Sequence, residues 1–163
     1  MELKIQHQGI IPNEYFAQAS SECQECFQAG YYFACITLCQ AVAEALARFM
    51  CEKSGWKPSV NFERNIAILS KERIEPFVTG YLVQARGKDR NDFHHLNKSV
   101  PTDFEELRLR AGKKIAAINQ AELQIFEHTM VGGLKPKYEK YWEMEEGRYP
   151  VYLRLDPKLN IIE

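Results

Sequence analysis

The stretch YYFACITLCQAVAEALARFMCE, residues 31–52, decides the fold of this chain. Its alanine-rich, apolar character predicts one long helix from about residue 31 to residue 54, with Gly55 as the natural C-cap. The polar side chains within it are three or four residues apart and form a single narrow stripe: Thr37, Gln40, Glu44 and Arg48. Because neighbours must bury the other sides of so apolar a helix, the stripe faces either solvent or an internal polar cleft.

Shorter helices are predicted on both sides of this run. Apolar residues at helical spacing indicate a helix over residues 14–29, and Asn13 stands where its N-cap would be. The same spacing predicts two further helices, over residues 61–72 and residues 75–86. We therefore expect the long helix to pack among several partners.

A second long helix is predicted in the C-terminal half. The sequence Thr102-Asp103-Phe104-Glu105 has the form of a capping box, and helical periodicity continues from it to about Thr129. Gly132 and Gly133 then close the segment. The apolar positions of this helix fall on one stripe: Phe104, Leu107, Ala111, Ile115, Ile118 and Ile125.

The two ends of the chain have a different character. Residues 3–11 alternate weakly and predict a short extended lead-in, while residues 137–146 predict a charged helix that carries aromatic residues. Residues 149–155 alternate around Pro150 like an edge strand, which we expect to pair with residues 3–6.

These elements predict an all-α fold, an up-and-down bundle of four to five main helices with a small C-terminal β appendage. We expect residues 1–133 to form the helical domain and residues 134–163 to form a helix-plus-strand extension packed on it. At 163 residues and 45% hydrophobic, the chain is long enough for one domain with a substantial core.

The charge balance excludes a protein with a strong overall basic field. The net charge is −1, so any nucleic-acid footprint must be local. Residues 86–114 contain eight lysines and arginines against five acids, a small local surplus of positive charge.

The five cysteines, at positions 23, 26, 35, 39 and 51, all fall inside predicted helices. That placement favours reduced, buried thiols over a secreted disulfide framework or a zinc site. The N-terminus lacks the features of a secretory signal, and Gln40, Glu44 and Arg48 interrupt the most apolar stretch. We expect a cytoplasmic protein with no membrane span.

The strongest chemical signal is the hexapeptide Arg90-Asn91-Asp92-Phe93-His94-His95. A guanidinium grips a phosphate with paired donors, and an imidazole exchanges protons near neutral pH. Asp89 is a plausible N-cap for a helix that begins at Arg90, where free backbone amides favour an anion. The hexapeptide therefore combines the groups that phosphoryl transfer without a metal requires.

The string Arg-Asn-x-x-x-His resembles the signature of the HEPN superfamily (higher eukaryotes and prokaryotes nucleotide-binding domains). In that family the motif follows two long helices, and here the alanine-rich run looks like the second of them. The resemblance covers about residues 13–128. It implies an all-helical, usually dimeric protein, and many members of the family are metal-independent endoribonucleases of toxin–antitoxin and antiphage systems.

The resemblance also implies roles for individual residues. RNA would be cleaved by its own 2′-hydroxyl, with His95 handling the proton and Arg90 stabilising the charge on the phosphorane, and with no metal or cofactor. Asn91 would hold a phosphate or orient the histidine. Related domains often carry an acid that faces the motif, so Glu44 is the candidate partner of Arg90.

Two histidines compete for the catalytic role. Residues four apart share a helix face, so helix geometry favours His94 beside Arg90, whereas the family spacing selects His95. A long arginine side chain, or a second copy of the motif across a dimer, would bring His95 into reach. We therefore expect Arg90 and His95 to be catalytic, with Asn91, His94 and Glu44 in support.

The expected partners follow from the same resemblance. They are RNA, a second copy of the chain, and an antitoxin or a nucleotidyltransferase. The alternative is a catalytically silent HEPN-type module that binds nucleotide or RNA or mediates assembly, and a third interpretation is a scaffold protein of a phage or mobile element.

Overall fold

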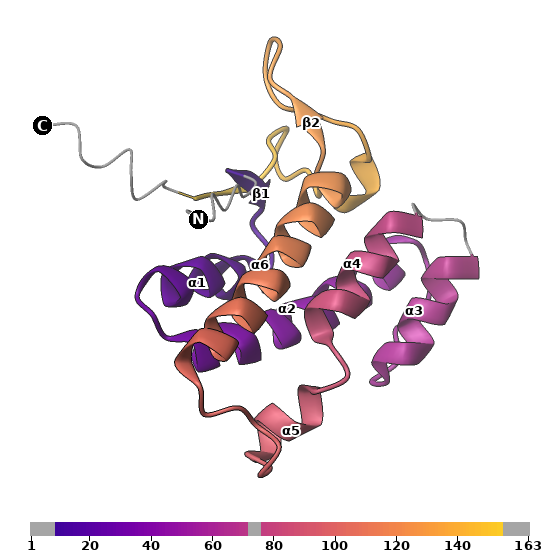
Figure 1. The fold of residues 1–163 in the computed structure, drawn as a ribbon. Coiled ribbons are helices and arrows are strands. Elements are labelled where there is room, and N and C mark those ends of the chain that lie inside the picture. The colour runs from indigo at the N-terminus through magenta and orange to yellow at the C-terminus, as the bar shows by residue number, and fades with distance from the viewer. Residues whose placement is uncertain (1–8, 72–75, 155–163) are drawn as a thin grey trace, which may run out of the picture.

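The computed structural model describes residues 9–71 and 76–154, and it shows a mostly helical protein in which five longer helices pack together (Figure 1). This confirms the predicted helical fold with small strands near the C-terminus. The helices are α1 (Ala17–Gln28), α2 (Tyr32–Lys53), α3 (Phe62–Lys71), α4 (Pro76–Arg86), the short α5 (Arg90–His95) and α6 (Phe104–Ile125).

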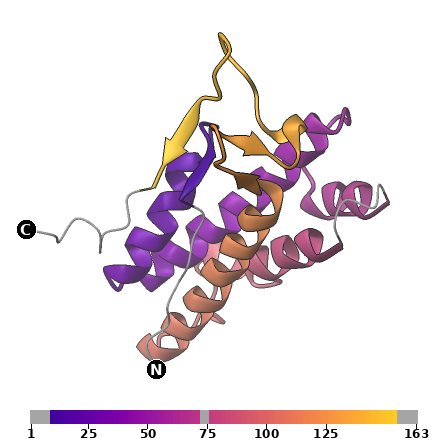
Figure 2. The ribbon, with the colours of Figure 1, turned by 90° about the horizontal axis from the view of Figure 1, so that it is seen from above.

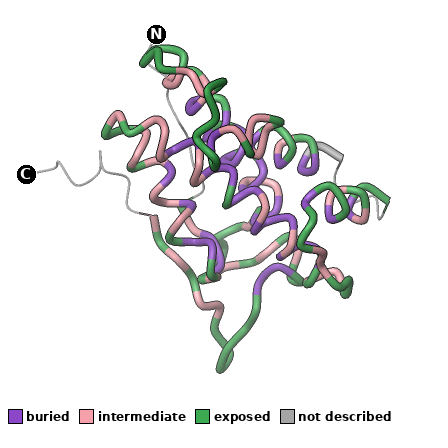
Figure 3. The backbone as a smooth tube through the Cα atoms, turned by 90° about the horizontal axis from the view of Figure 1, so that it is seen from below, coloured by how far each residue is buried: buried purple, intermediate pink, exposed green. Residues whose placement is uncertain are grey.

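Helix α2 is the centre of the fold and packs against α1, α3, α4, α5 and α6. By length and composition alone it could cross a membrane, but 61% of its most apolar window is buried within the protein, as in the core helix of a soluble domain. Figure 3 shows the buried positions gathered where the helices meet and the exposed ones along the outer turns.

Two small antiparallel sheets complete the structure near the C-terminal end of α6 (Figure 2). Strand β1 (Ile10–Pro12) pairs with β4 (Val151–Leu153), and β2 (His128–Thr129) pairs with β3 (Lys135–Pro136). The predicted C-terminal strand is present, but its partner is β1, whereas residues 3–6 lie outside the described residues. The expected boundary at residue 133 falls in the turn between β2 and β3.

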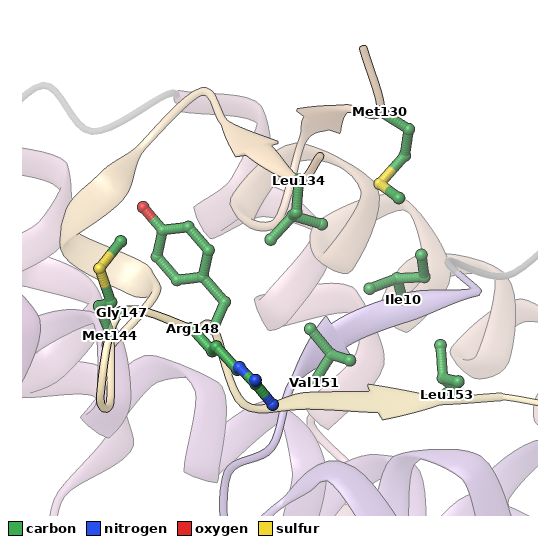
Figure 4. A pocket seen from close by; sticks show the side chains of 9 residues that line it. Ile10, Met130, Leu134, Met144, Gly147, Arg148, Val151 and Leu153 are labelled. Carbon is green, nitrogen blue, oxygen red and sulfur yellow. The ribbon is translucent and has the colours of Figure 1, made fainter. Parts of the chain in front are cut away.

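The sheets also border an open apolar hollow of about 540 Å³ (Figure 4). Ile10, Val151 and Leu153 line it from the β1–β4 pair, and Met130 and Leu134 line it from the β2–β3 hairpin. The hollow lies at the end of α6 opposite to α5 (Figure 1).

The predicted helix over residues 137–146 is wrong, because the structure has only the 3-10 turn η1 (Glu139–Tyr141) there. Tyr141 and Trp142 are both buried although they are consecutive, and their rings contact Phe49 and Phe126 respectively. The extended backbone at Trp142 lets both side chains enter the core, whereas helical geometry separates neighbouring side chains by about 100°.

Three helix ends differ from the prediction. The N-cap of α6 is Asp103 rather than Thr102, because the Asp103 carboxylate accepts a hydrogen bond from the Glu106 amide at 2.9 Å. The same helix ends at Ile125 rather than near Thr129, since Thr129 belongs to β2. Helix α1 begins at Ala17 because the Asn13 amide donates to the Pro150 carbonyl and continues the β1–β4 pairing instead.

A buried ion pair attaches the end of β4 to α6. Arg154 donates to both carboxylate oxygens of Glu122, at 2.6 and 3.0 Å, and both side chains are buried. Ser20 of α1 also hydrogen-bonds to this carboxylate and to Arg154. One buried charge pair therefore joins three segments that are far apart in the sequence.

Removing one member of this pair should destabilise the fold strongly, because the other charge remains buried. We expect Arg154→Met to lower the free energy of unfolding by about 3–5 kcal/mol in urea denaturation. Arg108→Met removes an arginine from the exposed pair with Glu105 and should cost less than about 1 kcal/mol. Equal effects of the two substitutions would contradict a structural role for the buried pair.

Candidate functional site

The motif hexapeptide forms α5, a short helix between α4 and α6 at the end of the molecule away from the strands (Figure 1). Phe93 anchors it, since this side chain is buried and its ring lies 5.4 Å from the ring of Phe33 on α2. Leu96 then takes a left-handed conformation, and the Asn97 amide bonds to the Asp92 carbonyl at 2.9 Å to end the helix. Phe93 therefore fixes α5 to the bundle, and the other side chains of this helix lie at or near the surface.

Arg90 and Glu44 are in direct contact. The Arg90 Nε donates to Glu44 Oε1 at 3.1 Å, and Arg90 Nη1 donates to Asn91 Oδ1 at 3.2 Å. The side chains of Arg90 and Glu44 are 30% and 20% exposed, so their pair lies at the edge of the bundle. The contact predicted between these two residues is present.

The polar stripe of α2 turns inward at this point rather than to solvent. Gln40 is fully buried, and its Nε2 donates to Asp89 Oδ1 at 3.3 Å. One turn further along, Glu44 reaches the motif. Of the two directions that the sequence left open, the middle of the stripe therefore faces an internal polar cluster.

Arg86 is a member of the cluster that the sequence did not reveal. Its Nε lies 3.4 Å from Glu44 Oε1, its Nη1 lies 2.8 Å from Glu63, and its guanidinium lies 5.1 Å from the centre of the Phe62 ring. One carboxylate oxygen of Glu44 therefore accepts from two guanidiniums. Arg86 and Arg90 belong to different helices, so their spacing in the sequence carried no signal of this arrangement.

Asp89 occupies the N-cap position of α5, as predicted, but its side chain makes no capping hydrogen bond. The carboxylate instead accepts from Lys114 Nζ at 3.1 Å and from Arg110 Nη1 at 3.2 Å, both on α6. Lys114 is only 5% exposed. Lys114 lies three residues after Ala111 and four before Ile118, so it places a charge on the apolar face of α6. A lysine on such a face is unusual, and this signal in the sequence could have identified Lys114 as a member of the site.

The two histidines have different surroundings. Partial burial and the positive charge of Arg90 lower the pKa of His94, and the negative charge of Glu44 opposes this shift. His94 therefore lies within the electrostatic field of the Arg90–Glu44 pair, as the spacing of four on a helix requires. His95 is exposed, and the described part of the chain shows no hydrogen bond or ion pair to it.

The cysteines belong to α1 and α2. All five are free, and Cys23, Cys35, Cys39 and Cys51 are buried. Hydrogen bonds with the Cys23 and Cys35 thiols, together with burial, raise the pKa of Cys39 well above its ordinary value, so that its thiol stays protonated. Within residues 9–71 and 76–154, no three His, Cys, Asp or Glu side chains are grouped so that they could hold a metal ion.

Comparison of the chain with protein-family models, curated proteins and solved structures found no match. The expected resemblance to HEPN domains therefore rests on the motif Arg90-Asn91-x-x-x-His95, on its place after the long helix α2 and on the acid that contacts it.

The lowered pKa of His94 gives a direct test of the site. Because burial and Arg90 disfavour the charged ring, the folded chain should keep His94 neutral to a lower pH than the unfolded chain does. NMR titration should show that Arg90→Met raises the pKa of His94. An unchanged pKa of His94 in the variant would show that Arg90 does not act on this ring.

Proposed function

We propose that this protein is a metal-independent endoribonuclease of toxin or defence type, which cleaves RNA through attack of the RNA's own 2′-hydroxyl. The observation that carries the proposal is the Arg90–Glu44 pair at the start of a short exposed helix with histidines at its end. The contact with Glu44 is structural support for the proposal, which otherwise depends on the sequence of the motif alone.

Arg90 keeps free donors for a substrate phosphate. A guanidinium has five N–H groups, and the contacts with Glu44 and Asn91 use two of them. The remaining donors would stabilise the charge that develops on the phosphoryl oxygens as the 2′-hydroxyl attacks. Glu44 holds the guanidinium by its Nε and so leaves one edge of the group for the phosphate.

A histidine would accept the proton of the 2′-hydroxyl. We assign this role to His95, because its spacing from Arg90 matches the family motif. His94 is the alternative, because it lies close enough to Arg90 to feel its charge. A ring whose pKa is lowered is neutral near pH 7 and is able to accept a proton. The described C-terminal segment lies at the opposite end of α6, so it does not cover α5 (Figure 1).

We further propose that two copies act together in the cytoplasm. A protomer with a net charge of −1 has little positive field to hold RNA, whereas two motifs on one side of an interface would build a basic groove. An antitoxin or a nucleotidyltransferase is the protein partner that the toxin–antitoxin version implies. Solution scattering that gave a monomer at working concentration would remove the dimer from this proposal.

The second candidate is a catalytically silent module that binds RNA or nucleotide or mediates assembly. Two observations favour it: Glu44 already compensates the charge of Arg90, and no hydrogen bond joins Arg90 to His95 in the described chain. Such a module would bind RNA without cleaving it.

Cleavage chemistry tests the proposal. The wild-type protein should cut a labelled RNA in EDTA and leave 2′,3′-cyclic phosphate ends, because a 2′-hydroxyl nucleophile needs no metal-bound water. Arg90→Met should lower the single-turnover rate by about 10²–10³-fold, as expected for the loss of one oxyanion donor. Arg64→Met, the same change at an exposed position on α3, should leave the rate unchanged.

The two histidines are compared in the same assay. His95→Ala should lower the rate by about 10²–10⁴-fold with little change in melting temperature, since the side chain is exposed, and His94→Ala should be milder. If His94→Ala is the inactive variant, the match to the family motif is off by one residue. Cleavage that requires added magnesium would contradict the mechanism, and binding without cleavage would favour the silent module.

A further inference from the structure

Lys114 is a buried lysine directly beneath the motif, and its ammonium group has an acceptor for each of its three N–H donors. Nζ donates to the carbonyls of Ala85 and Arg86 at 3.3 and 3.2 Å and to Asp89 Oδ1 at 3.1 Å. The first two acceptors are the last residues of α4, and the third precedes α5. One side chain of α6 thus connects the end of one helix to the start of the next.

The turn between these helices is shaped around this contact. Gly87 has a left-handed φ of +71°, and a Cβ atom there would collide with Lys114 Nζ and with Asp89 Oδ1. Because glycine has no side chain and adopts this conformation without strain, the backbone at Gly87 approaches the ammonium group closely. Lys114, Gly87 and Asp89 form one packed unit immediately before Arg90.

We propose that Lys114 is a positioning residue, which acts through Asp89 to fix the start of α5 and so the direction of Arg90. The expected effect on cleavage rests on the proposed function, whereas the orientation of Arg90 by Lys114 does not. Arg90 follows Asp89 directly, so a displacement of the Asp89 backbone moves the point from which the Arg90 side chain extends. Misplacement of a reacting group by about 1 Å can cost about 10²-fold in rate.

Stability alone does not account for the pair. Burying the ammonium group of Lys114 beside the partly exposed Asp89 has a desolvation cost that their attraction often only balances, and apolar residues of similar volume are often as stable. Arg110 already compensates the charge of the Asp89 carboxylate, and Gln40 donates a further hydrogen bond to it, so Lys114 is not needed for that charge. Lys114 instead fixes the orientation of Asp89, because it links this residue to the end of α4.

Adjacent lysines on α6 provide a matched experiment. Lys114→Met removes the buried ammonium group, and Lys113→Met removes an equal charge from an exposed neighbour. Asp89→Asn is a second variant that keeps the shape of the acceptor and removes the negative charge that faces Lys114. Each protein is assayed for single-turnover cleavage, for affinity to an uncleavable 2′-O-methyl RNA, and for the titration of His94 by NMR.

We expect Lys114→Met to lower the cleavage rate by about 10- to 10²-fold while the affinity for the uncleavable RNA changes less than about twofold. The pKa of His94 should move toward its ordinary value as Arg90 moves away, and Lys113→Met should change neither the rate nor this pKa. If Lys114→Met fails to fold, the same rate and titration changes are expected of Asp89→Asn.

Two outcomes separate this inference from the proposed function. If the folded variants of Lys114 and Asp89 keep the wild-type titration of His94 and the wild-type rate, the positioning role is overturned. If the titration of His94 changes but not even the wild-type protein cleaves RNA, the positioning role stands and the endoribonuclease proposal fails.

Discussion

The carboxylate of Glu44 is the constraint on which the candidate site depends. It sits on the most buried helix of the protein with only a fifth of its side chain exposed, and a carboxylate in that position requires charged or hydrogen-bonding partners. Arg86 at the end of α4 and Arg90 at the start of α5 supply them, both through the same oxygen. The need to satisfy one acid on α2 therefore brings two helix ends together at the surface and sets where the motif lies.

A second layer of charge lies behind the first. Asp89 and Lys114 form a pair within the bundle, and Arg110 and Gln40 complete the coordination of the carboxylate. Asp89 and Arg90 are consecutive in the chain, and each belongs to one of the two pairs. Lys114 of α6 holds Asp89, and Glu44 of α2 holds Arg90. The local field is consequently built from compensated charges, with the unused donors of Arg90 and the rings of His94 and His95 facing outward.

Much of the fold was predictable because helical periodicity is local information. The ends of α2 and α4 lie within a residue or two of the prediction, and the Arg90–Glu44 contact was expected from the motif's resemblance to HEPN domains. The prediction failed where tertiary contacts override local pattern, as at Tyr141 and Trp142, whose consecutive burial excludes a helix. Arg86 was missed for a related reason, since its partners Glu44 and Glu63 belong to other helices and no spacing in the sequence encodes those contacts. Lys114 did leave a signal, a charge on the apolar face of α6, but the sequence does not show which acid it contacts.

Hydrogen–deuterium exchange with an uncleavable 2′-O-methyl RNA tests the central claim most directly, because it locates the RNA without requiring turnover. The account predicts that bound RNA slows exchange at the end of α4 and in α5, in peptides that cover residues 86–98. The sheets at the far end of α6 should be unaffected. Protection confined to residues 130–153, or no protection anywhere at saturating RNA, would contradict the assignment of the functional site to the Arg90 motif.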